Sequence, residues 1–314
     1  MKTKRVGSSA STLGLGQTTR YGKLPLHSSA KELNLLLWIQ RVLPSISFVL
    51  AVSLLLLATG VKAQPNPCDW LGKSPATVEP VPGGPVTYRM TADYFNRTID
   101  GGFIDNTRVV GECTQGLPEG KERWNNCSIT TSHQPDGAYP EPTPLTYIEN
   151  FEFIPGYQIS EASAFPGWPE NSFHAKNLVW DMLAFEAFGL SHFDKLVLNT
   201  RIKPADIDGV VNLAGQGSFE NRNSTVRWMG VTSLNNIPCA VLEYRQMHGK
   251  VEVEMTGFKM KGRSHYWGTI WISLLTRRME RAEMTEDVLS YIEFQDQPGI
   301  RTNTLREITV EIIK

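Results

Sequence analysis

The sequence predicts an α+β protein in which a curved antiparallel β-meander packs over one apolar α-helix. From residue 209 onward apolar and polar residues alternate with a period of two, and short turn-rich links interrupt the alternation. One upstream segment, Phe173–Phe188, has the length and composition of a helix that is apolar on nearly every side. A sheet with one dry face must lay that face on another apolar element, and this helix is the obvious partner.

About six strands are expected in the C-terminal half, with further strands in the N-terminal part. The six segments are Thr225–Ser233, Pro238–Gln246, Lys250–Lys261, His265–Leu274, Met279–Phe294 and Thr304–Ile313. The links contain the turn dipeptides Asn235-Asn236, His248-Gly249, Gly262-Arg263, Thr276-Arg277 and Pro298-Gly299. Because links this short join antiparallel neighbours, the segments form a meander.

The N-terminal part contributes a strand, a hairpin and a proline-rich connection. Val86–Phe95 alternates like a half-buried strand, and the turn residues near Gly120 predict a hairpin between Cys113 and Cys127. Residues 133–169 carry seven prolines, which exclude a helix or a central strand there. A long ordered connection with one short strand at Leu145–Phe153 is expected instead.

The helix has recognisable ends and two acidic residues. Asn171 or Ser172 can cap its start, and Gly189 suits the left-handed residue after its end. Asp181 and Glu186 are five residues apart, so they point about 140° away from each other and do not form an acid/base pair. Each is expected to face an edge, a cap or a buried arginine.

Residues 1–63 have the features of a targeting segment. A basic leader precedes the uncharged core Ser47–Ala58, and Val61-Lys62-Ala63 provides a cleavage site before Gln64. We therefore expect an exported protein, periplasmic or secreted, with residues 64–314 as a single mature domain. The alternative is an uncleaved membrane anchor formed by residues 42–61, a run just long enough to span a bilayer.

The charge distribution excludes one class of partner. Residues 1–63 hold eight Lys/Arg and one acid, so the remaining 251 residues hold 23 Lys/Arg against 31 Asp/Glu. A body at −8 argues against nucleic-acid binding. Contact with a membrane is expected only through the N-terminal segment, if that segment is uncleaved.

Four cysteines lie after the leader, an even number that fits an oxidising compartment. The hairpin spacing predicts a Cys113–Cys127 disulfide, which leaves Cys68 for Cys239. The alternative, four buried free thiols, fits such a compartment less well. A zinc site is not expected, because the chain has no CxxC and no cysteine near a histidine.

The stretch from Tyr266 to Met284 carries a resemblance to a known family. It reads as a strand with Gly268-Thr269-Ile270, a short turn, and a longer strand with Met279 three residues before Ala282. This pattern resembles the hairpins of exported proteins related to the lipoprotein-localisation-factor clamshell, over residues 205–314 and the strand at Val86–Phe95. The resemblance implies a curved antiparallel sheet that wraps helices and holds acyl chains or other apolar ligands. The single clear helix, the proline-rich segment and the cysteines depart from the pattern, and no functional residue carries over.

Catalytic motifs are not found in the sequence. The segment Gly215–Glu220 lacks the third glycine of a phosphate loop, no G-x-S-x-G follows the leader, and HExxH is absent. We predict no catalytic residues, no metal ligands and no cofactor, so an enzyme is the less favoured class.

Aromatic residues are the candidates for ligand binding. They are Trp180, Phe185 and Phe188 on the helix and Tyr244, Tyr266, Trp267 and Trp271 on the strands. The same residues also fit an ordinary core. The predicted function is an exported binding protein for an apolar or lipid-like ligand, held between the sheet and the helix. The alternatives are an extracytoplasmic interaction or structural module without a pocket, and a secreted hydrolase whose groups converge only in three dimensions.

Overall fold

The computed structural model describes residues 66–71, 83–295 and 297–313. The predicted leader, its cleavage site and the alternative anchor at 42–61 lie outside the described residues. Among the helices that are described, none is long and apolar enough to cross a membrane.

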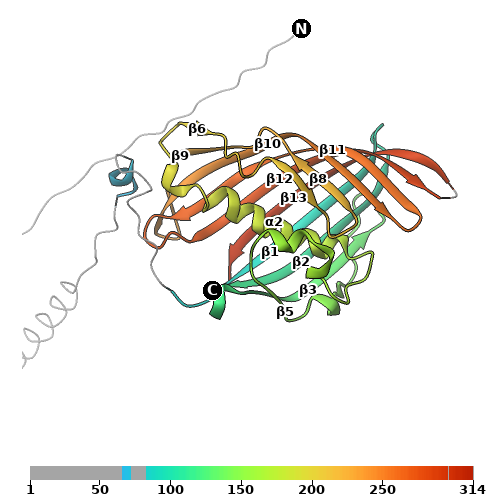
Figure 1. Ribbon diagram of the computed structural model, residues 1–314, viewed down its shortest axis with the longest axis horizontal. Helices are drawn as coiled ribbons and strands as arrows, with labels where there is room; N and C mark the ends of the chain where they lie inside the picture. Colours follow the sequence, from blue (N-terminus) through green and yellow to red (C-terminus); the bar gives the residue numbers. More distant parts are fainter. Residues whose placement is uncertain (1–65, 72–82, 296, 314) are drawn as a thin grey trace, which may run out of the picture. The chain divides into compact units, whose positions relative to one another are not determined.

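The described chain forms one antiparallel sheet, and the predicted fold class is confirmed (Figure 1). The strands are β1 (Val86–Thr98), β2 (Phe103–Gln115), β3 (Glu122–Ser132), β4 (Thr143–Pro144), β5 (Phe151–Phe153), β6 (Arg201–Ile202), β7 (Gly209–Asn212), β8 (Gly217–Asn221), β9 (Thr225–Leu234), β10 (Ile237–Met255), β11 (Phe258–Ser273), β12 (Met279–Phe294) and β13 (Gln297–Ile312). Their order is β4-β3-β2-β1-β13-β12-β11-β10-β8-β7, with β5 on β3, β9 on β10 and β6 on β9. The pairing of β1 with β13 joins the N-terminal strands to the C-terminal meander.

The C-terminal strands are longer than predicted, and three expected turns are wrong. Asn235-Asn236 and Thr276-Arg277 lie in turns, and Met279–Phe294 is a strand with the predicted bounds. The other three dipeptides lie inside strands: His248-Gly249 in β10, Gly262-Arg263 in β11 and Pro298-Gly299 in β13. The actual turn between β10 and β11 lies at residues 256–257, within the segment predicted as the strand Lys250–Lys261.

Two of the misplaced turns are β-bulges. Between Gln246 and Gly249 the strand β10 has one residue more than its partner, and His248 takes up a positive φ of 68°. A second irregularity in register follows Ile292, opposite the Pro298-Gly299 dipeptide. The proline is tolerated because β13 pairs with β1 only from Thr302 onward, so its first residues form a free edge.

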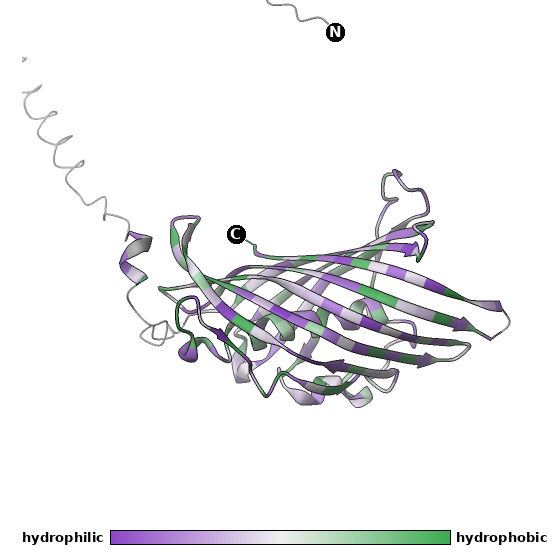
Figure 2. Ribbon diagram, turned by 90° about the horizontal axis from the view of Figure 1, so that it is seen from above, coloured by the Kyte–Doolittle hydropathy of each residue, from purple (hydrophilic) through white to green (hydrophobic). Residues whose placement is uncertain are grey.

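The helix α2 (Phe173–Gly189) lies on the concave face of the sheet, as predicted (Figures 1 and 2). Its side chains are buried on almost every side, including Ala175, Leu178, Val179, Met182, Phe185 and Phe188. Its C-terminal end packs closely on β11, since a side chain at Gly189 would meet Ile270 and Ile272.

The proline-rich connection covers another side of α2. The indole Nε1 of Trp180 donates to the carbonyl oxygen of Ile159 at 3.2 Å, and the ring meets Phe165 edge-on at 6.1 Å. The strand predicted at Leu145–Phe153 is only partly correct, because its first half forms the short 3-10 helix η4 (Thr146–Ile148) and only β5 is extended. Further 3-10 turns are η1 (Pro67–Trp70), η3 (Pro118–Gly120), η5 (Tyr157–Ser160), η6 (Ala162–Ala164) and η7 (Phe193–Lys195).

The predicted disulfides are not formed. Cys113, Cys127 and Cys239 are buried free thiols, and the side chain of Cys68 lies outside what the structure describes. The reason is the register of the β2–β3 hairpin, which places Trp124 opposite Cys113 and shifts at a bulge between Val110 and Glu112. Burial raises the pKa of Cys127 and of Cys239 to about 12, so both stay as thiols. The cysteines therefore add no support for export.

Candidate functional site

A cavity of about 980 Å³ lies between the concave sheet and α2. This is the upper end of the volume range of small-molecule sites in proteins. Strands β1, β2, β7, β8 and β10–β13 contribute to its wall, together with α2 and the loop around Pro155–Ser160. The cavity is therefore enclosed by segments far apart in the sequence.

The sheet side of the cavity is ordered in rows, because antiparallel pairing places residues of neighbouring strands side by side. We call Tyr94, Arg306, Glu286 and Tyr266 the charged row. The next two rows along the strands are mixed, and they contribute Asn96, Thr304, Val288, Thr302 and Ser290 to the lining; we call them the hydroxyl rows after Thr304, Thr302 and Ser290. The apolar rows come last and contain Ile300, Ile292, Met260, Val253, Phe294, Phe258 and Met255. The lining thus changes from charged to apolar along the strands.

The apolar rows form the open end of the cavity. Phe294 is 38% exposed and Ile300 is 37% exposed, whereas Arg306 in the charged row is only 7% exposed. Phe258 and Phe294 meet edge-on at 5.9 Å between ring centroids, at the ends of their strands. On the sheet side of the cavity, the charged row is therefore the buried end and the apolar rows are the exposed end.

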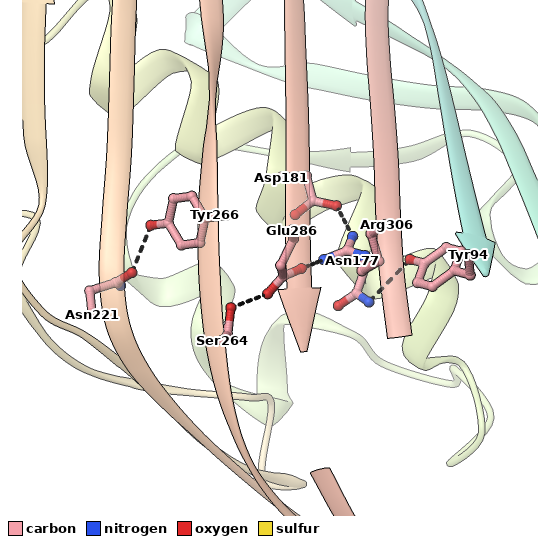
Figure 3. Close-up of polar contacts among 8 residues, drawn as sticks. All are labelled: Tyr94, Asn177, Asp181, Asn221, Ser264, Tyr266, Glu286 and Arg306. Atoms are coloured by element: carbon pink, nitrogen blue, oxygen red, sulfur yellow. Dashed lines mark hydrogen bonds and ion pairs between the residues drawn. The ribbon is translucent and has the colours of Figure 1, made fainter. Parts of the chain in front are cut away.

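Hydrogen bonds and ion pairs connect the charged row to α2 (Figure 3). The guanidinium of Arg306 donates to both Asp181 on α2 and Glu286 on β12, and it lies 4.9 Å from the ring centre of Tyr94. The row is extended by three further bonds: Ser264 Oγ to Glu286 Oε1 at 2.5 Å, Asn177 Nδ2 to the Tyr94 hydroxyl at 3.2 Å, and the Tyr266 hydroxyl to Asn221 Oδ1 at 2.7 Å. Of the three surroundings expected for the acids of the helix, an edge, a cap or a buried arginine, Asp181 has the buried arginine.

The cavity wall carries an excess of acidic groups. Five carboxylic acids line it, Asp105, Asp181, Glu186, Asp206 and Glu286, against the single guanidinium of Arg306. Burial raises the pKa of Asp181 to about 6, although Arg306 opposes the shift. Burial also lowers the pKa of His174 to about 4, so this histidine adds no positive charge at neutral pH.

A second buried acid pair ties the C-terminal part of α2 to the sheet. Glu186 is hydrogen-bonded to Glu122 on β3 and accepts a bond from Gln115 Nε2 on β2. Burial and the neighbouring Glu122 carboxylate raise the pKa of Glu186 well above its ordinary value, which favours the protonated form of Glu186 beside Glu122. The Cys113 thiol contacts Glu122 at 3.6 Å, and burial first, then this carboxylate, raise its pKa well above the usual range. A thiol in such surroundings is not an activated nucleophile.

The structure separates the seven predicted aromatic residues into three groups. Trp180, Phe188 and Tyr266 line the cavity. Phe185 and Tyr244 are each 1% exposed and pack on each other in the core below it.

Trp267 and Trp271 do not face the cavity. Successive side chains along β11 point to opposite faces of the sheet. Tyr266 and Ile270 point to the concave face, so Trp267 and Trp271 point to the outer face. Trp267 is 43% exposed on the outer face, and the ring of Trp271 lies under Arg281 at 5.6 Å.

The polar residues of the charged row were not among the predicted site residues. The sequence did contain one signal, because Arg306 occupies a position of the alternating face that otherwise carries Ile308, Val310 and Ile312. A charged residue on a dry face needs a buried partner. The sequence did not mark Glu286 in the same way. Its pairing with Arg306 can be assigned only when the register of β12 and β13 is known. Within the described part of the chain, no cluster of three or more His, Cys, Asp or Glu side chains is placed to hold a metal ion.

Comparison with known proteins adds little at the level of sequence. No protein-family model and no curated protein matches the chain. A solved structure of lipovitellin, described by its lipid-protein interactions, is similar with a TM-score of 0.38 and 12% identity. The match covers 75% of this chain and 26% of the lipovitellin chain, so this chain spans about a quarter of the length of that one.

Proposed function

We propose that the chain binds an apolar or amphiphilic ligand, of the size of a lipid, in the cavity between α2 and the sheet. The observation that carries the proposal is the cavity of about 980 Å³ with its open apolar rows. Large side chains such as Phe294 and Ile300 stay more than a third exposed there although they lie on the concave face. A helix that filled the sheet completely would have favoured a module without a pocket; here space for a ligand is left.

A charge placed in the apolar rows tests this proposal. Met260 faces the cavity and its neighbour Lys261 is exposed on the outer face, so Met260→Glu and Lys261→Glu add the same group on opposite sides. Calorimetric titration with dodecanol, a neutral probe, is expected to show an affinity at least about tenfold weaker for Met260→Glu, because burying a carboxylate beside the chain is costly. Lys261→Glu should bind like the unmodified protein. Equal binding by both variants, or no binding by the unmodified protein, would overturn the proposal.

Export with cleavage after Ala63 is part of the same proposal. It is supported by the basic leader, the uncharged core Ser47–Ala58 and the small residues before Gln64. N-terminal sequencing of protein expressed with its leader should find Gln64 first. Retention of residues 1–46 would instead favour the anchor at 42–61.

A further inference from the structure

We infer that the ligand is a long-chain amphiphile with a cationic amine head, which lies against the charged row while its chain follows the apolar rows to the open end. The inference rests on the proposed function and adds to it the charge and the orientation of the ligand. It is carried by the order of the rows and by the balance of charges at the buried end.

The length of the cavity fits a head and a chain bound in line. Glu286 in the charged row and Phe294 in the last apolar row are eight residues apart on β12, about 27 Å at about 3.4 Å per residue. A single acyl chain in a membrane spans half of a hydrocarbon core of about 30 Å, or about 15 Å. The hydroxyl rows between the two ends leave room for the polar part of the ligand.

The charges at the buried end favour a cation. Asp181, Glu286 and Arg306 form a trio in which two carboxylates share one guanidinium. One negative charge of this trio is therefore unbalanced. Asp105, which also lines the cavity, adds a further carboxylate. An ammonium group placed here would gain attraction from these carboxylates in a site screened from water.

An anionic head fits poorly at the same place. Both terminal nitrogens of Arg306 are engaged by carboxylates, and its Nε is buried without a partner and out of reach of solvent. A carboxylate head would therefore meet two like charges and no free guanidinium face. Free fatty acids are expected to be poor ligands for this reason.

The binding of an amine should depend on pH through Asp181. The charged and titratable groups that interact with Asp181 are Arg306 on β13, Glu286 on β12 and the phenols Tyr94, Tyr244 and Tyr266 on β1, β10 and β11. His174, on α2 itself, interacts with Arg306. The phenols and His174 are neutral near pH 7, because burial raises the pKa of each phenol and lowers that of the histidine. Below about pH 6 Asp181 takes up a proton, the trio becomes neutral, and the attraction for an amine weakens.

The experiment compares three probes of equal chain length by calorimetric titration at pH 7.5: dodecylamine, dodecanol and dodecanoate. Dodecylamine is expected to bind about tenfold more tightly than dodecanol, and dodecanoate more weakly than both. Dodecanoate binding as tightly as dodecylamine would overturn the inference, while the dodecanol result would still support the proposed function. If none of the three binds, the proposed function itself fails.

Variants locate the charge effect. Asp181→Asn should reduce the ratio of dodecylamine to dodecanol affinity about tenfold and remove its decline below pH 6. Asp105→Asn is a second variant, at a less buried carboxylate that needs no arginine, and it should reduce the same ratio even if Asp181→Asn does not fold. Asp136→Asn in an exposed loop is the control. An unchanged ratio in every folded variant would overturn the inference.

Discussion

At the scale of single residues, the buried ionisable groups fall into two arrangements with different charge balance. In the charged row one guanidinium serves two carboxylates, Asp181 and Glu286. In the pair of Glu122 and Glu186 no cation of the described residues balances the two carboxyl groups, and burial raises the pKa of both. Both arrangements connect α2 to the sheet. Protonation of Asp181 or Glu186 therefore changes the strength of the contacts between α2 and the sheet.

Replacement of Glu186 by glutamine should stabilise the protein at high pH. Because the pKa of Glu186 is raised in the folded state by burial and by Glu122, its protonated form contributes stability that is fully present below the ordinary glutamate pKa of about 4.5. That stability is lost as the pH rises through the raised value. The side-chain amide of Glu186→Gln can donate to Glu122 at every pH and accept from Gln115. The unfolding free energy at pH 8 should therefore increase by about 1–3 kcal/mol, and the melting temperature should increase with it.

Thermal unfolding at pH 4.5 and pH 8 measures this effect. The unmodified protein and Glu186→Gln should differ more at pH 8 than at pH 4.5. Glu152→Gln, in an exposed ion pair with Arg123, is the matched control and should change little at either pH. A variant less stable than the unmodified protein at pH 8 would show that Glu186 is held as a carboxylate.

At the scale of elements, the sequence located the helix and the strand-forming segments but not where each strand begins and ends: Pro238–Gln246 and the start of Lys250–Lys261 are one strand, β10. Period-two alternation located all the long C-terminal strands, and apolar character located α2. Turn-type dipeptides were ambiguous, because His248-Gly249 and Pro298-Gly299 accompany irregular pairing inside strands, not hairpins. A glycine or proline marks local departure from regular pairing, and only the partner strand decides whether the chain turns back or bulges.

The same limit explains which site residues could be predicted. Parity along β11 assigns Tyr266 and Trp267 to opposite faces, but the sequence alone does not say which face is concave. The charged row depends on the register of four strands, so its members came together only in the structure. Arg306 was the single member that the pattern marked as unusual.

Gly268 is required for the packing of β11 against Tyr244. A Cβ at Gly268 would lie 1.9 Å from the carbonyl oxygen of Glu283 and 2.5 Å from the Tyr244 hydroxyl, which donates to that same oxygen. Gly268→Ala should therefore destabilise the protein by about 1–3 kcal/mol or more, since the buried ring and the strand must move. Gly84→Ala, where a Cβ meets nothing within 4 Å, should change the stability by less than about 0.5 kcal/mol.

Chemical denaturation measured on both variants tests this prediction. Equal stability of Gly268→Ala and Gly84→Ala would mean that the Tyr244 side chain can move aside without any loss of stability. In that case the glycine of the Gly268-Thr269-Ile270 pattern would have no packing role in this protein.

At the scale of the described molecule, the long strands have a packed half and an open half. In the packed half Ala282 and Val310 are fully buried, as is Ile270 beside them, under the cover of α2. In the open half the same strands continue as the apolar rows, with Phe294 and Ile300 partly exposed. β11 and β12 are paired along both halves, apart from the irregularity between β12 and β13 after Ile292, so the main difference between the halves is apolar cover.

This division predicts two rates of amide hydrogen exchange along single strands. Without ligand, residues 251–262 and 288–295 should exchange at least about tenfold faster than 268–273 and 279–285, because opening the uncovered half exposes less apolar surface. Dodecanol at about one hundred times its dissociation constant should slow exchange in the open half up to about one hundredfold, since binding stabilises the closed state by about 2.7 kcal/mol. The packed half should change little. Uniform exchange along β11 and β12, or protection confined to the packed half, would show that the open rows are not where an apolar chain binds.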